Sequence, residues 1–112
     1  MNGTESKADK IRELNDQLRT TFTGGQVVIT RGIQSLGESV RTEIMAAISQ
    51  FDAWSEDVDP HGEHDFVAVE VRGHKVFAKV DYYDIEMKFL SPDPTDPEVT
   101  RRVLTIMLAE EY

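Results

Sequence analysis

The sequence predicts an α+β fold, in which helices cover one face of an antiparallel sheet of about four strands. Three observations support this prediction. Apolar residues recur at helical spacing in the first half of the chain, they alternate at strand spacing between residues 65 and 90, and helical spacing returns near the C-terminus. A length of 112 residues with 39% hydrophobic content suits one core. We therefore expect a single domain over residues 1–112, with residues 1–5 as a disordered N-terminus.

The first helix is expected over residues 6–21. Its apolar positions repeat every three or four residues, and Ser6 and Asp9 form a weak capping pattern at its start. Gly24 and Gly25 follow as a stop. The apolar stripe consists of Ile11, Leu14 and Leu18.

A short strand and a second helix come next. The β-branched run QVVIT predicts a buried strand near residues 26–31. Ser35 and Glu38 have the spacing of a capping box, which predicts a helix over residues 36–51. One face of that helix is apolar and carries Val40, Ile44, Ala47, Ile48 and Phe51. The segment 52–64 has turn residues and no period, so we expect a loop.

A three-stranded meander is expected over residues 65–90. Valines alternate before and after Gly73, which predicts a hairpin that turns at this glycine. Asp84 is expected to form the next turn, because Ile85, Met87 and Phe89 alternate again beyond it. The third strand of the meander is therefore placed at 85–89.

The chain is expected to end in a helix over residues 97–111. Asp96 suits an N-cap position and Pro97 suits the first helical position. The apolar face of this helix would be broad and consist of Val99, Val103, Leu104, Ile106, Met107 and Leu108. We expect it to pack on the sheet.

Negative charge is concentrated in the middle of the chain. The net charge is −9, and residues 37–70 contain nine acidic residues and one basic residue, a net charge of −8. Such a field repels nucleic acid and attracts basic protein surfaces. The alternative is that these acids form a solvated face that only maintains solubility. Basic residues elsewhere are interleaved with acids and form no stripe, so direct nucleic-acid binding is not expected.

An aromatic residue lies within the acidic segment. Trp54 is the only tryptophan, and an aromatic anchor surrounded by charge is a common interface arrangement. It is equally consistent with the sequence that Trp54 extends the apolar face of Phe51. The predicted partner-binding residues are Asp52, Trp54, Glu56, Asp57, Asp59 and Glu63.

The stretch HGEHDF at 61–66 raises the question of a metal site. Histidine and carboxylate side chains can bind metals, but alternate residues of one extended run point to opposite sides and cannot enclose an ion by themselves. An alternative metal site would therefore need a distant ligand, which Asp81 or Asp84 could supply. The alternative set is His61, Glu63, His64 and Asp81. The simpler interpretation is that His64 or Asp65 hydrogen-bonds to the backbone of the loop.

Other chemistries are less compatible with the sequence. Asp57, Asp59 and Gly62 match the first half of an EF-hand loop, but Ala68 occupies the position that requires a bidentate carboxylate, so an EF-hand is excluded. Cysteine is absent, and no nucleophile motif or phosphate-binding glycine motif is present. We predict no catalytic residue and no cofactor, and we favour a protein that is not an enzyme. No secretory or membrane-spanning segment is recognisable, so we expect a cytoplasmic protein without membrane association.

Five blocks of the chain resemble a known family. TFTGG at 21–25, GEHDF at 62–66, DYYD at 81–84, SPDPTDP at 91–97 and RVLTIMLAEEY at 102–112 are similar to a small bacterial family catalogued as domain of unknown function 3768. The resemblance covers about residues 8–112. It implies a short protein that is often encoded on plasmids and other mobile elements and has no agreed activity. Genes in such neighbourhoods often counter host defence, which suggests an anti-restriction or anti-CRISPR role.

These observations together predict an acidic protein-binding module. We expect its partner to be a basic protein surface, such as the nucleic-acid-binding site of a host defence complex, which the module would occlude as a DNA mimic. The alternative is a small metal-dependent enzyme that uses the HGEHDF and DYYD cluster. The expected state is a monomer or a homodimer.

Overall fold

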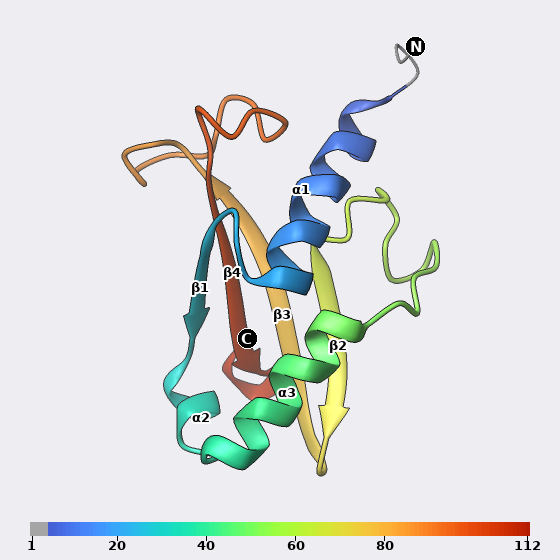
Figure 1. Cartoon of the computed structure of the whole chain (residues 1–112), viewed down its shortest axis with the longest axis vertical. Coiled ribbons are helices and arrows are strands. Elements are labelled where there is room, and N and C mark those ends of the chain that lie inside the picture. The colour runs from blue at the N-terminus through green and yellow to red at the C-terminus, as the bar shows by residue number, and fades with distance from the viewer. Residues whose placement is uncertain (1–4) are drawn as a thin grey trace.

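The computed structural model describes residues 5–112 and has an α+β architecture, as the sequence predicts. Three helices lie on one face of a sheet of four strands (Figure 1). In sheet order the strands are β1 (Gln26–Ile29), β4 (Arg101–Leu108), β3 (His74–Tyr83) and β2 (Phe66–Val71). The helices are α1 (Lys7–Thr21), α2 (Arg31–Gln34) and α3 (Glu38–Gln50), and a 3₁₀ turn, η1 (Ala109–Glu111), follows β4. The prediction of a disordered N-terminus falls on residues 1–5, of which 1–4 lie outside the described residues.

Helix α1 begins as the sequence predicts but ends for a different reason. Ser6 accepts a hydrogen bond from the backbone of Asp9, whose side chain accepts one from the Ser6 N–H, so the capping box is complete. At the other end Phe22, rather than a glycine, adopts the left-handed conformation, with φ of 59°. Gly25 instead permits a close approach to β4, because a Cβ atom at this position would lie 2.6 Å from the Arg102 carbonyl oxygen.

Strand β1 lies at an edge of the sheet, so the prediction that it is buried is wrong. It pairs only with β4, in parallel, and Gln26 and Val28 are exposed on one side of it. The strand stops at Ile29, and residues 31–34 form the short helix α2, which the sequence pattern did not indicate. One parallel pair makes the sheet mixed rather than antiparallel.

Helix α3 has the predicted apolar face but not the predicted cap. Ile44 and Ile48 are fully buried, and Val40, Ala47 and Phe51 pack around them. The N-cap residue is Gly37, and it makes no side-chain hydrogen bond. The predicted capping residue, Ser35, donates its hydroxyl to the Gly32 carbonyl and belongs to the end of α2.

The predicted hairpin at Gly73 is confirmed. Strands β2 and β3 are antiparallel, with Val71 paired to His74 and Phe66 paired to Lys79. Arg72 and Gly73 make the turn with φ of 52° and 84°, a conformation that explains the glycine.

The predicted third strand of the meander, 85–89, is wrong. Asp84 accepts hydrogen bonds from the backbone N–H groups of Lys88 and Phe89, and Met87 has φ of 63°. These contacts curl the segment into a turn, which leaves a single bridge between Tyr83 and Leu90. Its apolar residues therefore point into solvent: Ile85, Met87, Phe89 and Leu90 are 44%, 45%, 73% and 78% exposed.

The predicted C-terminal helix, 97–111, is also wrong. Residues 101–108 form β4, which lies in the middle of the sheet between β1 and β3. Asp96 caps a turn, in which it accepts a hydrogen bond from the Glu98 N–H. Residues on both sides of β4 are buried, so its apolar run lacks the alternation that distinguishes an exposed strand. A continuous apolar run does not separate a central strand from a helix.

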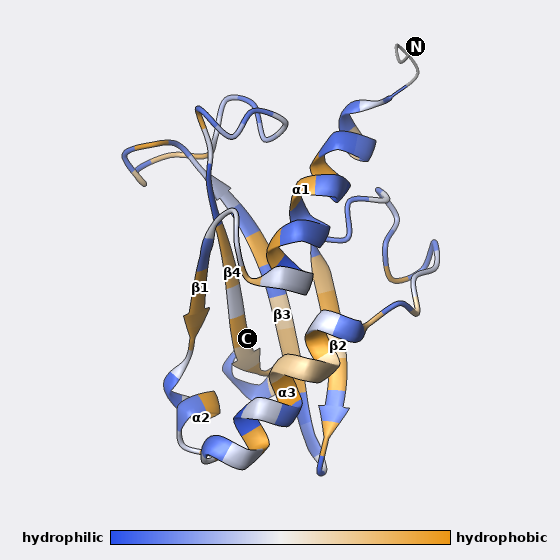
Figure 2. Ribbon diagram, viewed as in Figure 1, coloured by the Kyte–Doolittle hydropathy of each residue, from blue (hydrophilic) through white to orange (hydrophobic). Residues whose placement is uncertain are grey.

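The two faces of the sheet differ. Val67, Val76, Ala78, Leu104 and Ile106 point toward the helices and form the core with Leu18, Ile33, Ile44 and Ile48. Hydrophobic residues run along the neighbouring strands, whereas the connecting loops are mainly hydrophilic (Figure 2). The other face, which we call the uncovered face, carries Phe66, Ala68, Phe77, Lys79, Thr105 and Met107. Within residues 5–112 no helix has the length and apolar content needed to cross a membrane.

Candidate functional site

The connection between α3 and β2, residues 51–65, holds most of the predicted site and is named here the acidic loop. It projects beyond the β2 edge of the sheet (Figure 1). Asp59 holds its turn together, because its side chain accepts a hydrogen bond from the His64 N–H at 3.1 Å and its carbonyl accepts one from the Gly62 N–H. The Asp59 side chain is only 6% exposed. Asp59 therefore stabilises the conformation of the loop.

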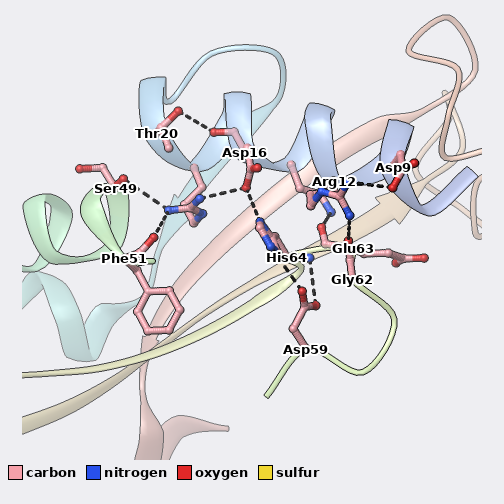
Figure 3. Close-up of polar contacts among 12 residues, drawn as sticks. Asp9, Arg12, Asp16, Thr20, Ser49, Phe51, Asp59, Gly62, Glu63 and His64 are labelled. Carbon is pink, nitrogen blue, oxygen red and sulfur yellow. Dashed lines mark hydrogen bonds and ion pairs between the residues drawn. The ribbon is translucent and has the colours of Figure 1, made fainter. Parts of the chain in front are cut away.

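His64 joins the acidic loop to α1. Its Nδ1 atom lies 2.8 Å from Asp16 Oδ1, and its Nε2 atom lies 3.4 Å from Asp59 Oδ2 (Figure 3). The same Asp16 oxygen accepts a hydrogen bond from Arg19 Nη2 at 2.9 Å. The ring of His64 is therefore held between two carboxylates, in agreement with the interpretation that it fixes the loop.

Trp54 packs inside this arrangement. Its ring stacks on His64 with centroids 3.7 Å apart and planes 5° from parallel, and it meets Phe51 edge-on at 4.7 Å. The Arg19 guanidinium carbon lies 5.2 Å from the Trp54 ring centroid. Trp54 thus extends the apolar face of Phe51 and is only partly accessible.

Arg19 of α1 binds the backbone where α3 ends and the acidic loop begins. Its Nη1 atom donates to the carbonyl oxygens of Ile48 and Phe51, at 3.0 and 3.2 Å, and so satisfies backbone groups at the end of α3. Its Nε atom has no hydrogen-bond partner among the described residues. Arg12 makes a similar contact farther along the loop, with Nη1 2.9 Å from the Gly62 carbonyl oxygen (Figure 3).

A buried polar network continues from the loop to the centre of the sheet. Asn15, which is fully buried, donates to the Glu63 carbonyl at 3.0 Å and to the Tyr82 hydroxyl at 2.8 Å. Arg102 donates from Nε to the Asn15 side-chain oxygen at 2.7 Å and from Nη2 to the Pro94 carbonyl at 2.6 Å. The network therefore contacts both long loops of the molecule.

Burial shifts the titration of three groups in this network. It raises the pKa of Glu63 above its usual range, and the neighbouring carboxylate of Asp65 raises it further. Burial also raises the pKa of Tyr82 and lowers the pKa of Arg102. The Tyr82 hydroxyl partly opposes the shift at Glu63, since it lies 3.4 Å from Glu63 Oε1 and favours the ionised carboxylate.

The six predicted partner-binding residues fall into two groups. Trp54, Asp59 and Glu63 are partly or largely buried and contact the rest of the fold. Asp52, Glu56 and Asp57 are exposed, and no basic side chain of residues 5–112 lies within ion-pair distance of them. The second group is the part of the predicted site whose carboxylates are exposed and have no basic partner among residues 5–112.

The four residues of the alternative metal site are not brought together. His61 is exposed, whereas the His64 ring is occupied by Asp16 and Asp59. Asp81 lies between the core-facing residues Val80 and Tyr82, so it points to the uncovered face, where it pairs with Lys79 at 3.2 Å. Across the described part of the chain, no three histidine or carboxylate side chains are arranged to hold a metal ion.

The residues that hold the acidic loop were missed in the sequence. Asn15 and Arg19 occupy helical positions in register with Ile11 and Leu18, which are apolar and buried. A polar residue within an apolar stripe indicates a buried polar contact, because burial without a partner is costly. Asp16 carried no such indication, since it lies beside the stripe on a half-exposed position.

The fold and the site define a small α+β protein that presents an acidic loop fixed to its first helix. The chain belongs to the family described as protein of unknown function DUF3768, whose model matches residues 29–111. The match includes three of the five blocks, and the fourth apart from its final Tyr112, but TFTGG at 21–25 lies outside it. No curated protein and no solved structure matches the chain.

Proposed function

We propose that this protein is a non-enzymatic binding module that recognises a basic protein surface through Asp52, Glu56 and Asp57. The observation that carries the proposal is that these three neighbouring carboxylates are exposed and lack basic partners among residues 5–112. An uncompensated group of carboxylates makes the local electrostatic potential more negative and accelerates encounter with a positively charged surface.

The rigidity of the acidic loop favours this role. Asp59, His64 and Asp16 hold the loop to α1, and Arg12 and Arg19 bind its backbone. The two arginines direct their charge to Asp9 and Asp16, so they do not neutralise the three exposed carboxylates. A preorganised surface loses less conformational entropy on binding than a flexible one does.

The partner class follows from the charge pattern and the family. Carboxylates can take the place of phosphates on a surface that normally binds nucleic acid, and a bound acidic module would then occlude that surface. Since the family resemblance implies carriage on mobile elements, we extend the proposal to the inhibition of a host defence complex, of the anti-restriction or anti-CRISPR kind.

The test is a neutralising triple variant, Asp52→Asn, Glu56→Gln and Asp57→Asn. Wild-type and variant protein would be used to capture proteins from the native host, and each captured protein would be identified and assayed for nucleic-acid binding. We expect the triple substitution to weaken capture by roughly tenfold at low salt and to flatten its salt dependence. Wild-type protein should displace nucleic acid from the captured partner, and the variant should not.

The matched control removes three charges elsewhere. Glu86→Gln, Glu98→Gln and Glu110→Gln make the same change in net charge at exposed positions outside the acidic loop. Equal weakening by both triple variants would show that only net charge matters and would contradict the proposal. Asp59 and Glu63 are left unchanged, because Asp59 holds the turn of the loop and Glu63 is partly buried beside Tyr82, so substitution of either would change stability as well as charge.

A further inference from the structure

A groove beside the acidic loop offers apolar surface to the same partner. A pocket of about 480 Å³ lies along the outer strand β2 and is lined by Phe51, Ala53, Asp57, Val58, Phe66 and Ala68. A second pocket of about 260 Å³ shares Ala68 and continues along β2 to Glu70, Lys75 and Phe77. We call the two together the β2 groove. The larger pocket is within the usual size range of binding pockets for small groups.

The lining of the larger pocket is apolar except at one point. Asp57 is its only charged residue, and Val58 is 51% exposed although it is aliphatic. Phe66 and Ala68 belong to the uncovered face, while α1, α2 and α3 lie on the other face (Figure 1). Tyr112 packs against Phe66 of the larger pocket and Phe77 of the smaller one, with ring centroids 6.1 and 5.7 Å away.

We propose that the β2 groove binds a large apolar side chain that the basic partner carries between lysine or arginine residues. This inference rests on the proposed function, because it places the anchor of the same partner next to the three exposed carboxylates. Charge complementarity at the loop end of the groove selects this occupant: Asp57 lies in the pocket wall, and Asp52 and Glu56 lie in the same loop. At the far end Glu70 stands opposite Lys75, so the uncompensated negative charge lies beside the larger pocket. Energetic anchors of interfaces are commonly apolar side chains buried at the centre of a charged rim.

A second copy of the chain is the competing occupant. The turn at residues 85–90 exposes Met87 and Phe89 on either side of Lys88, so it also combines apolar side chains with a basic one. Two copies with a net charge of −9 each would repel one another, which favours a basic partner instead. The experiment includes self-association as one of its outcomes.

The probes are two short synthetic peptides. One has lysine residues on both sides of a single phenylalanine, and the other has alanine in place of that phenylalanine. Binding is measured by titration of isotope-labelled full-length protein and by the resulting shifts of amide resonances. We expect the phenylalanine peptide to bind roughly tenfold more tightly, as burial of most of an aromatic side chain implies. Its largest shifts should lie at Ala53, Val58 and Ala68.

Two groove variants separate the apolar contribution from charge. Ala68→Phe places bulk at the exposed position shared by both pockets, and Val58→Ser removes apolar surface without adding bulk. Each should abolish the preference for phenylalanine and leave the affinity for the alanine peptide unchanged. The Asp52, Glu56 and Asp57 neutral variant should weaken both peptides and keep the preference. If Ala68→Phe lowers the unfolding midpoint, Val58→Ser alone provides the test.

The outcomes distinguish the two proposals. Equal affinity of wild-type protein for both peptides would overturn the groove and leave the proposed function standing. Absence of binding by either peptide would contradict both. A wild-type dimer in sedimentation that Ala68→Phe dissociates would assign the groove to a second copy and overturn the basic partner.

Discussion

The two long loops of this protein use the same residue type in different ways. The acidic loop is held by contacts to a distant helix: His64 reaches Asp16, and Arg19 reaches the Phe51 carbonyl. The loop from 84 to 100 is held mainly by its own aspartates. Asp84, Asp93 and Asp96 each accept hydrogen bonds from backbone groups two to five residues ahead.

This difference determines which carboxylates are free. In the loop from 84 to 100 the side-chain oxygens of these aspartates are occupied by backbone N–H donors of their own loop. In the acidic loop Asp59 alone takes that role, and Asp52, Glu56 and Asp57 remain exposed. A count of acidic residues does not separate these two cases, whereas the hydrogen-bond partners do.

The largest expected effect comes from the residue that joins the two loops. Arg102→Met removes the hydrogen bonds to Asn15 and to the Pro94 carbonyl and leaves both acceptors without that donor. We expect a loss of roughly 3 kcal/mol in the free energy of unfolding, measured by urea denaturation. The neighbouring substitution Arg101→Met is the control, because Arg101 is exposed, and it should change stability by less than about 0.5 kcal/mol. Similar losses for both variants would refute the role of the network.

The next effect is confined to the acidic loop. His64→Ala removes the contacts to Asp16 and Asp59 and the stacking surface of Trp54. We expect a loss of roughly 1–2 kcal/mol, a change in tryptophan fluorescence, and faster amide exchange in residues 51–65. The control is His61→Ala, since His61 is exposed. If exchange in the loop stays at the wild-type rate, His64 does not hold it.

A smaller effect is expected in the other loop. Asp84→Ala removes the acceptor for the Lys88 and Phe89 N–H groups. We expect a loss of roughly 1 kcal/mol, with faster exchange at residues 85–90 and unchanged Trp54 fluorescence. Glu86→Ala in the same turn serves as the control. A response of the acidic loop to Asp84→Ala would show that the two loops are not held independently.

The smallest effect is an opposite response of the two loops to pH. Hydrogen bonds from Thr95 lower the pKa of Asp93 below its usual 3.8, so Asp93 stabilises the fold above the unfolded pKa and this contribution is lost as pH falls through the folded pKa. Burial raises the pKa of Glu63 above its usual 4.5. Ionisation of Glu63 therefore costs more in the folded state, and stability falls as pH rises from the unfolded pKa to the folded pKa. Carboxyl resonances should show Glu63 protonating at higher pH than Asp93. The reverse order would contradict this assignment.

The stability of two variants checks the same signs. Glu63→Gln should gain stability relative to wild type as pH rises above the usual glutamate pKa of 4.5, because the cost of ionisation is absent. Asp93→Asn should show its deficit above the usual pKa of aspartate and lose that deficit in acid. If the free energy of unfolding of both variants follows the same pH dependence as that of the wild type, titration of Glu63 and Asp93 does not affect stability.

Elements that bury one face could be predicted from the sequence, whereas the strand that buries both faces could not. Helices α1 and α3 and the β2–β3 hairpin each bury one side, so their period is visible and they were placed correctly. Strand β4 buries both sides, and its apolar run was assigned to a helix. The segment 85–89 alternates, but the Asp84 side chain accepts hydrogen bonds from the Lys88 and Phe89 N–H groups and curls the segment into a turn.

The sequence showed where the acidic residues of the candidate site lie but did not show which of them are exposed. Charge is additive along the chain, so the acidic segment was visible without a structure. Which acids are free depends on partners far away: Asp16 lies 48 positions from His64, and Asn15 lies 48 positions from Glu63. The β2 groove was invisible for the same reason, because Phe51 and Ala68 become neighbours only when β2 folds beside the loop.

The hydrogen bond between Asn15 and Arg102 also has a consequence for the order of folding. These residues are 87 positions apart, so the contact closes almost the whole chain and incurs a large entropy cost before any energy is gained. The β2–β3 hairpin can form earlier from local contacts, whereas the Glu63 and Pro94 carbonyls gain their partners only after the first helix meets the last strand. The acidic loop should therefore gain its contact to Asn15, and the loop from 84 to 100 its contact to Arg102, in the same late step, and a newly made chain could complete this network only once β4 has been synthesised.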